Sequence, residues 1–449
     1  MTTQTTRSLD EVVGELEESY IASSPRSRAY FERGQSSMAG APKGAYFHKP
    51  YPLTMSRGEG CYLYDLDGRR FVDCANHHTA QILGHANAPV AEVVQRQLER
   101  GIALGAPMGV EAEMCEELCR RVASLERIRF CNSGTEATLH AIRLARFFSG
   151  RGRVAKFEGG YHGSHDGVEI SVSPPLDQAG PSAAPVALPT AGGMAPNAAE
   201  NVVILPYDDE AAVARLVEQY RDDLACIIFD PKAGVWSQRP EFVRAVRECA
   251  RKHGVLFILD EIVGFRVGMG GLQEHYGIDP DLTTYGKVVG GGFPAGAFGG
   301  RAELMDLLDN SQGASGIFQS GTFSAHPMVM AAGMATLRQL TPEAFVHLNG
   351  MGERLREGLE ALFERQQIAA KIVVLGSLFS LYFTDQEVSN YRVAAKADQR
   401  LSYPIFLALL EQGYFLNQGL GMCALSLPMS TDHVDGLVEA MGMAIERVI

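Results

Sequence analysis

The feature that most constrains the fold is a regular alternation between about residue 85 and residue 330. Segments with helical periodicity alternate there with short apolar runs, each of a length suited to one buried strand. Four of these runs are clear: 127–131, 202–205, 225–229 and 255–259. Strands that alternate with helices predict an α/β fold with a mostly parallel sheet.

The remainder of the chain predicts a second, smaller α+β domain. A length of 449 residues with 46% hydrophobic residues exceeds what one simple domain needs. Residues 60–74 have the pattern of a hairpin, and long helical patterns with few strands follow residue 330. The expected parts are an N-terminal segment of the small domain (1–70), the large domain (71–330) and the C-terminal small domain (331–449).

Charge and composition exclude several kinds of partner. The formal net charge of -13 argues against nucleic acid. The N-terminus lacks the apolar stretch of a signal peptide, and no run approaches the roughly 20 apolar residues that span a membrane. The eight cysteines are scattered and form no CxxC pair. We therefore expect a cytoplasmic protein with reduced thiols and no nucleic-acid or membrane partner.

The segment CNSGTEA at 131–137 follows an apolar run and opens a predicted helix. Ser133 and Glu136 have the spacing of a capping box. Gly134 and the hydroxyls of Ser133 and Thr135 make this helix start suitable for a phosphate. The apolar face expected for the helix comprises Ala141, Leu144, Ala145 and Phe148. An ordinary capped helix is the alternative, because short capping patterns recur widely.

Asp260 directly follows the apolar run 255–259, which puts it at the carboxyl end of a buried strand. Ligands of open α/β sheets bind at that edge. A carboxylate there needs a partner, because an unpaired buried charge is costly. A protonated pyridine nitrogen is one such partner, since the pairing keeps the ring electron-withdrawing. A metal ligand and a helix cap remain alternatives.

Lys287 stands between the strand-like segment LTTYG and the glycines 290–292. A partly desolvated amine with a lowered pKa at such a place can form a Schiff base. The alternative is a phosphate-binding lysine in a glycine loop. The P-loop spacing fails, because Asp281 occupies the first glycine position and Val288 follows the lysine. A dinucleotide-binding GxGxxG also fails, because Gln273 occupies its last position.

The segment GGYHG at 159–163 is expected in a loop at a strand end, where Tyr161 can stack on a flat heterocycle. A glycine turn with a buried tyrosine is the alternative. His162 together with His165 and Asp166 could begin a metal cluster. No further ligand stands at a suitable spacing, so no metal site is expected.

Five motifs in this order resemble the class III (ω-type) aminotransferases, which are pyridoxal-phosphate (PLP) enzymes of fold type I. The similarity runs from about residue 40 to the C-terminus, and it is closest to the subgroup of glutamate-1-semialdehyde aminomutases and β-phenylalanine aminotransferases. The motifs are SGTEA (133–137), GGYHG (159–163), DEIVGFR (260–266), GKVVGGGFPAGAFGG (286–300) and GTFSAHP (321–327).

The resemblance implies that PLP is the cofactor and that Lys287 carries it as a Schiff base. It implies that Asp260 pairs with the pyridine nitrogen. The phosphate group would bind to Ser133, Gly134 and Thr135.

The ring faces and a second subunit complete the implied site. Tyr161 would cover one face of the ring with His162 nearby, and Ile262 would pack on the other face. Thr322 would reach the phosphate bound by a partner subunit. The resemblance therefore implies a homodimer with shared active sites.

The implied reaction is transamination between an amine or amino acid and a carbonyl acceptor, both small molecules. An aminomutase or an amino-acid racemase is the alternative, because it shares every motif. A protein of this fold that only binds a ligand would need neither Lys287 nor Asp260. A nucleotide-binding enzyme is disfavoured by the failed glycine spacings.

The sequence departs from the family where substrates are recognised. Asp230 stands where the family often has glutamate. Two arginines that bind the substrate carboxylate in β-amino-acid relatives align with Lys43 and Leu420. We therefore expect an amine with a substantial apolar part and either no carboxylate or one contacted by Lys43. Arg266 is the alternative cation.

Overall fold

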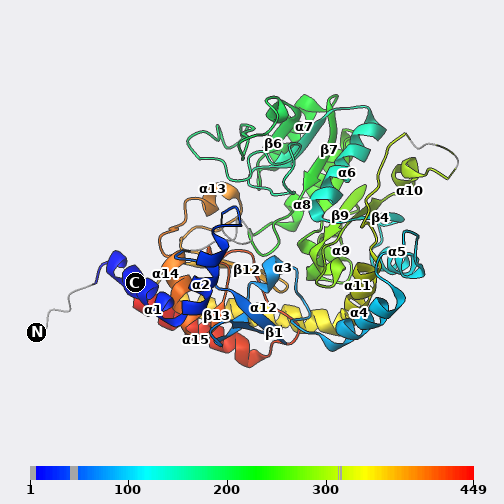
Figure 1. Cartoon of the computed structure of the whole chain (residues 1–449). Coiled ribbons are helices and arrows are strands. Elements are labelled where there is room, and N and C mark those ends of the chain that lie inside the picture. Colours follow the sequence, from blue (N-terminus) through cyan, green and yellow to red (C-terminus); the bar gives the residue numbers. More distant parts are fainter. Residues whose placement is uncertain (1–6, 41–48, 312, 314–315) are drawn as a thin grey trace, which may run out of the picture. The chain divides into compact units, whose positions relative to one another are not determined.

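The computed structural model describes residues 7–40, 49–311, 313 and 316–449, and these divide into two units (Figure 1). Unit 1 takes its described residues from 1–87, 350–385 and 397–449. Unit 2 takes them from 88–349 and 386–396. Each unit has its own sheet or sheets.

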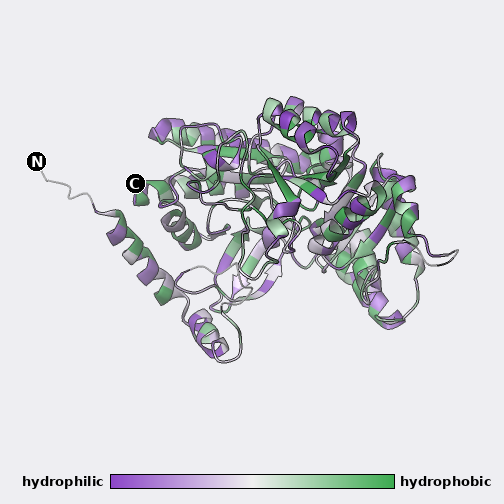
Figure 2. Ribbon diagram, turned by 90° about the horizontal axis from the view of Figure 1, so that it is seen from above, coloured by the Kyte–Doolittle hydropathy of each residue, from purple (hydrophilic) through white to green (hydrophobic). Residues whose placement is uncertain are grey.

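A seven-stranded sheet forms the centre of unit 2, in the order β4-β10-β9-β8-β7-β5-β6. Only β10 runs antiparallel to its two neighbours among these described strands, so the sheet is mostly parallel as the sequence predicts. Strands β6 to β10 of this sheet are buried at every residue, which is typical of a sheet buried on both faces. Figure 2 colours the chain by hydropathy, with hydrophobic residues in green. The strands are β4 (Arg127–Cys131), β5 (Arg153–Phe157), β6 (Val202–Leu205), β7 (Leu224–Phe229), β8 (Leu256–Asp260), β9 (Leu282–Gly286) and β10 (Gly296–Gly300).

Helices of unit 2 pack on this sheet and on each other. Helix α6 contacts β7, β8, β9 and β10, and α7 contacts α8. The long helices are α4 (Ala88–Arg100), α5 (Gly109–Arg121), α6 (Gly134–Ser149), α7 (Glu210–Tyr220), α8 (Pro240–Lys252) and α11 (Pro327–Gln339). The short helices are η2 (Ala198–Asn201), η3 (Gly264–Val267), α9 (Gly271–Tyr276), η4 (Lys287–Gly290), α10 (Ala302–Met305), η5 (Asp306–Leu308) and α13 (Tyr391–Ala394).

Helix α6 buries three of the four residues expected on its apolar face. Ala141, Leu144 and Ala145 are completely buried. Phe148 is 40% exposed, so its assignment to the buried face is wrong. It lies one residue before the last residue of the helix, Ser149.

Unit 1 contains two smaller sheets and several helices. One sheet has the order β1-β2-β3-β13 and the other β11-β12-β14. The strands are β1 (Met55–Glu59), β2 (Tyr62–Asp65), β3 (Arg70–Asp73), β11 (Lys371–Leu375), β12 (Leu378–Tyr382), β13 (Tyr414–Phe415) and β14 (Cys423–Ala424). The helices are α1 (Leu9–Ser23), α2 (Pro25–Gly34), α3 (Asn76–Thr79), α12 (Pro342–Gln366, whose first residues belong to unit 2), α14 (Ser402–Glu411) and α15 (Thr431–Val448).

Residues 71–87 belong to unit 1, whereas the sequence assigned them to the large domain. Residues 331–349 and 386–396 belong to unit 2, whereas the sequence assigned them to the small domain. For residues 71–87 the cause is strand pairing. Strand β3 pairs with β2 as the expected hairpin, with Tyr62 opposite Val72, and it also pairs with β13 from the C-terminal part of the chain. The hairpin strand thereby joins the N-terminal and C-terminal parts of unit 1. No helix in the described part of the chain is both long and apolar enough to cross a membrane.

Candidate active site

Asp260 is the last residue of β8, at the carboxyl edge of the parallel sheet. It is buried and lies opposite Thr284 of β9. Its Oδ1 accepts hydrogen bonds from the backbone N–H of Ile262 (3.1 Å) and the hydroxyl of Thr284 (3.2 Å). The carboxylate is therefore fixed by the strand ends, as expected for a ligand group at this edge.

His162 follows β5 and is bonded to Asp260. Its Nδ1 lies 2.7 Å from Oδ2 of Asp260, and the ring is buried. Burial lowers the pKa of His162, and the charge of Asp260 opposes this shift. A neutral ring that donates from Nδ1 leaves Nε2 as an acceptor. Nε2 has no hydrogen-bond partner among the described residues.

The start of α6 forms a helix N-terminus close to the same edge. Ser133 is the N-cap, and its Oγ accepts from the backbone N–H of Glu136 over 3.2 Å. The carboxylate of Glu136 accepts from the N–H of Asn132 (2.9 Å) rather than from that of Ser133. The expected capping box is thus half formed. Thr135 Oγ1 accepts from the N–H of Ser164 (3.4 Å), which ties the loop after β5 to the helix start.

Ile262 packs against two glycines at the strand ends. A Cβ on Gly134 would lie 2.7 Å from Cδ1 of Ile262, and one on Gly286 would lie 3.3 Å from Cγ2. Side chains at these two positions would therefore displace Ile262. Ile262 thus lies between the start of α6 and the end of β9. Lys287 directly follows β9.

Lys287 begins η4 immediately after β9, with φ 51°. A non-glycine residue in this left-handed region is a strained conformation that concentrates at functional sites. Burial lowers the pKa of the Lys287 amine. The carboxylates of Asp260 and Asp230 raise it, and the ammonium of Lys232 lowers it further. A lysine with a lowered pKa is suited to nucleophilic chemistry.

Two predicted residues are exposed. Tyr161 is 50% exposed, and its hydroxyl lies 3.4 Å from Oγ of Ser164. Thr322 is exposed beside Gly321, whose ideal Cβ would lie 3.2 Å from Nδ2 of Asn132. The loop of Thr322 therefore lies beside the loop that opens α6.

Other cations and candidate ligands lie elsewhere. Lys43 is outside the described residues. Arg266 is completely buried, and so is Leu420, which belongs to the core of unit 1 rather than to a cavity wall. The side chains of His165 and Asp166 have hydrogen-bond partners other than the His162 ring. His165 contacts the hydroxyl of Thr138 (3.3 Å), and Asp166 accepts from the N–H of Ala195 (3.0 Å). In the described residues no three His, Cys, Asp or Glu side chains form a group that could hold a metal ion.

The sequence reasoning did not assign a role to Asp230 and Lys232, which follow β7. The charge of Asp230 raises the pKa of Lys287, and the charge of Lys232 lowers it. A signal existed, because Asp230 ends an apolar strand in the same way as Asp260. The pairing of Phe229 with Leu259 brings these two aspartates to neighbouring strand ends.

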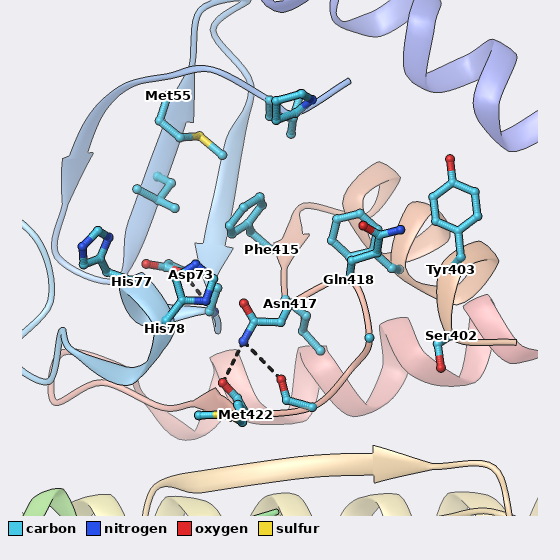
Figure 3. Close-up of a pocket in the computed structure, with 18 of the residues that line it drawn as sticks. Met55, Asp73, His77, His78, Ser402, Tyr403, Phe415, Asn417, Gln418 and Met422 are labelled. Carbon is cyan, nitrogen blue, oxygen red and sulfur yellow. Dashed lines mark hydrogen bonds between the residues drawn. The ribbon is translucent and has the colours of Figure 1, made fainter. Parts of the chain in front are cut away.

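A separate pocket lies within unit 1 and has a volume of about 880 Å³ (Figure 3). Asn417 lines this pocket and fixes the loop that follows it. Its Nδ2 donates to the carbonyls of Gly421 (3.1 Å) and Met422 (2.7 Å). One edge is the turn Asn76–Thr79, in which all four residues have positive φ. The walls include Leu53, Met55, Leu63, His77, His78, Phe406 and Phe415. This apolar pocket, edged by imidazoles, has the size of small-molecule sites.

The donor set around Lys287 fits PLP. The cofactor has an aldehyde, a ring nitrogen and a phosphate. The structure offers a lysine amine with a lowered pKa, a buried carboxylate, and a helix N-terminus with Ser133 and Thr135. The residues that would hold these three groups all come from the loops and strand ends of unit 2.

Comparisons with known proteins agree with this chemistry. Glutamate-1-semialdehyde 2,1-aminomutase of Methanocaldococcus jannaschii is 36% identical over 428 residues, which cover 94% of this chain and 97% of the relative. A β-phenylalanine aminotransferase of Variovorax paradoxus is 34% identical with a TM-score of 0.88, and 98% of each chain is covered. A transaminase solved with PLP bound is 29% identical with a TM-score of 0.87, over 95% of this chain and 98% of that one.

The family assignment rests on most of the length of the chain. The family model described as aminotransferase class-III matches residues 44–445. The resemblance, the fold class and the cofactor expected from the motifs are thereby confirmed. The chain belongs to the class III aminotransferases, which are PLP-dependent enzymes.

Proposed function

We propose that Lys287 carries PLP and that Asp260 pairs with its ring nitrogen. The observation that carries the proposal is the position of a lysine with a lowered pKa next to a buried aspartate at one sheet edge. The proposed phosphate ligands are Ser133, Gly134 and Thr135, and the proposed ring contacts are Tyr161, His162 and Ile262. In this proposal unit 2 is the large, cofactor-binding domain and unit 1 is the small domain.

PLP supplies an aldehyde that condenses with amines and a ring that withdraws electrons from the adjoining carbon. The side chains of this protein supply orientation and proton transfer. With PLP bound, a free Lys287 amine would take the proton from the substrate carbon that bears the amino group. Asp260 keeps the ring nitrogen protonated, and the His162 ring holds Oδ2 of Asp260 in place.

The family reaction is amino transfer between an amine or amino acid and a carbonyl compound. An aminomutase, which moves the amino group within one molecule, is a second candidate. It is favoured by the relative from Methanocaldococcus jannaschii, which is 36% identical. An amino-acid racemase would use the same lysine and aspartate.

A panel of amine donors and carbonyl acceptors tests the reaction. Bound cofactor makes the purified protein yellow, and a productive donor bleaches it. An aminotransferase needs a separate carbonyl compound to restore the colour and consumes it in proportion to the product. An aminomutase or racemase turns over one substrate without steady consumption of an acceptor.

Borohydride reduction followed by peptide mapping tests the role of Lys287. The PLP adduct should lie on Lys287, and Lys287→Ala should lose the adduct and nearly all turnover. An adduct on another lysine would contradict the assignment. Lys252→Met, which removes an exposed lysine of α8, is the matched control and should keep both.

The proposed substrate is an amine with a substantial apolar part, and any carboxylate it has contacts Lys43. Lysine is a point charge with looser geometry than the fork of arginine, so it holds a carboxylate less selectively. Paired amines with and without a carboxylate, compared in the wild type and in Lys43→Ala, test this contact. A strong preference for β-amino acids that survives in Lys43→Ala would exclude it.

The proposed active unit is a cytoplasmic homodimer in which Thr322 reaches the phosphate bound by the partner subunit. Phe318 and Phe323 are 78% and 60% exposed on either side of Thr322. Large exposed aromatic side chains that cluster on a surface indicate an interaction site. All eight cysteines are free, which is compatible with a reducing compartment.

A further inference from the structure

Lys232 is a buried lysine in the turn that follows β7. Its side chain is 9% exposed, and its φ is 55°, in the left-handed region. Its Nζ lies 3.3 Å from Oδ2 of Asp230 and 5.7 Å from the ring centre of Trp236. A buried ammonium needs such a partner, because an unpaired charge in the interior is costly.

Asp230 is anchored on the backbone side as well. Its Oδ1 accepts from the backbone N–H of Lys232 over 2.8 Å, and its carbonyl accepts from the hydroxyl of Tyr207 over 2.6 Å. The turn therefore holds the aspartate and the lysine together as one unit. This local pairing fixes both charges with respect to the end of β7.

The strand register brings this pair to the edge where Lys287 lies. Phe229 of β7 pairs with Leu259 of β8, so Asp230 and Asp260 end neighbouring parallel strands. Two carboxylates thus stand at adjacent strand ends. Lys287 follows β9, the next strand in the sheet.

The charged groups around Lys287 come from three parts of unit 2. Asp260 of β8 and Asp230 after β7 stabilise its protonated form, and Lys232 destabilises it. Lys232 itself also faces Lys156 of β5, whose pKa is lowered well below its usual value by burial and then by Lys232.

His162 is the remaining titratable group next to Asp260. Burial lowers its pKa, so its ring is neutral near neutral pH and adds no charge. With His162 neutral, the charge felt by Lys287 depends on Asp260 and on the pair formed by Asp230 and Lys232.

We propose that Lys232 is a positioning residue of the active site, which holds Asp230 in an ion pair and so keeps this carboxylate from becoming the counter-ion of Lys287. The proposal deepens the proposed function and rests on Lys287 as the reactive amine. Without Lys232, Asp230 would be a buried carboxylate without its ion-pair partner, and its charge already raises the pKa of Lys287. Lys287 would then stay protonated to higher pH, and less of it would be a free nucleophile.

Three variants separate the ion pair from a merely structural role. Lys232→Met removes the cation at similar volume, Asp230→Asn removes the carboxylate, and the double variant removes both charges. Because a Schiff base would block the Lys287 amine, PLP is first removed from the full chain with hydroxylamine. Competitive labelling with trace acetic anhydride over a pH series, read by peptide mass mapping, then gives the pH midpoint of that amine. Lys252→Met is again the matched control, because it removes an exposed lysine of α8.

The expected shifts have opposite signs. Lys232→Met raises the Lys287 midpoint by about 1 pH unit, since an opposite charge nearby favours the protonated amine. Asp230→Asn lowers the midpoint, and the double variant returns it close to that of the wild type. Lys232→Arg retains the ion pair and rescues the wild-type value. Thermal unfolding followed by circular dichroism checks that each variant folds.

An unchanged or lowered midpoint in Lys232→Met would overturn the proposal. If Lys232→Met does not fold, the comparison of Asp230→Asn with the double variant decides the matter, because the double variant has no unpaired buried charge. Equal midpoints in those two variants would also overturn it. Failure of the proposed function can be told apart from failure of this proposal, because the labelling is read without bound PLP. If the purified protein binds no PLP, the proposed function is refuted, and the labelling still measures the effect of Lys232 on Lys287.

Discussion

His162 holds Asp260 through a hydrogen bond of 2.7 Å between Nδ1 and Oδ2. The two residues are 98 positions apart in the sequence and join the loop after β5 to the end of β8. The bond sets the tautomer of the buried ring, because a donor at Nδ1 leaves Nε2 unprotonated in the neutral form. Asp260 is therefore oriented from one side by His162 and from the other by Ile262 and Thr284.

Asp260→Asn should keep the fold and lose most of the activity. The asparagine carbonyl can still accept from Ile262 and Thr284, but the charge that we propose faces the ring nitrogen of PLP is gone. A hydrogen bond to a charged group contributes about 1.5–3 kcal/mol, so turnover should fall by at least about tenfold. Steady-state kinetics and PLP affinity measure the loss, with circular dichroism as the control. Turnover close to that of the wild type would exclude this role for Asp260.

The sequence could predict the parallel sheet because its strands are buried on both faces. Such strands are nearly continuous apolar runs, and the predicted runs 202–205 and 225–229 fall on β6 and β7. The site followed from the same pattern, since the residue after each run lies at the carboxyl edge. The pattern alone thus places Asp260 at this edge, where the structure has it.

Strand β10 could not be predicted from propensity, because three of its five residues are glycine. The reason is the close approach of neighbouring backbone. A Cβ on Gly296 would lie 2.0 Å from the carbonyl oxygen of Ser133, and one on Gly299 would lie 2.3 Å from that of Arg127. Glycine is required there by tertiary packing, which a local pattern does not report.

The sequence also could not predict which charged side chains contact one another. Neither the bond from His162 to Asp260 nor the placement of Lys232 near Lys287 has a local signal, because strand order in the sheet decides both. The strained turn Asn76–Thr79 likewise depends on contacts with β14, which lies more than 300 residues away in the sequence.

His165 should make the protein less stable on mild acidification. Burial, and then the neighbouring His162, lower its pKa to about 4. The unfolded chain takes up a proton on His165 as the pH falls through about 6.5, whereas the folded chain takes it up only near pH 4. Protonation therefore favours the unfolded chain between these two values. The free energy of unfolding is highest above pH 6.5 and decreases as the pH falls from about 6.5 to about 4. The loss at about pH 5.5 is about 1 kcal/mol.

His165→Asn removes this titration. The amide oxygen can replace Nδ1 as acceptor for the N–H of Gly167, which lies 3.3 Å away. The drop in unfolding temperature between about pH 7.5 and about pH 5.5 should therefore be smaller than in the wild type. His162 is present in both proteins, so a difference between the two drops reports His165 together with its coupling to His162. An equal drop in the two proteins would refute the assignment.

Asn76 should stabilise unit 1 through its side chain and its backbone. Its Nδ2 donates to the carbonyls of Asp73 (2.9 Å) and Ala424, and its φ is 47°. Asn76→Ala loses both bonds and adds a left-handed alanine, which costs about 1–2 kcal/mol by itself. Asn76→Gly is the matched control, because it loses the same bonds without that penalty. Alanine should therefore lower the unfolding temperature more than glycine does, and the reverse order would show that the backbone is not strained here.

A mixture of two defective chains should regain activity if the sites are shared between subunits. Lys287→Ala lacks the reactive amine, and Thr322→Ala is expected to lose affinity for the phosphate bound by its partner. In a hybrid dimer, the site with the intact Lys287 receives the intact Thr322 from the other chain, whereas the second site has both defects. Random mixing gives about half hybrids with one working site in two, so about a quarter of wild-type activity should return.

Refolding the two variants together and assaying at one dilution measures this recovery, and light scattering at the same dilution gives the oligomeric state. Phe318→Asp tests the surface beside Thr322, because Phe318 is 78% exposed and a charge there should weaken an apolar contact without disturbing the core. It should shift the protein toward monomers and lower activity in parallel. Activity in the mixture equal to the sum of the separate variants, or full activity of a monomer, would exclude shared sites. A homodimer with self-contained sites would remain compatible with the first result, and the Phe318→Asp variant then distinguishes it from a monomer.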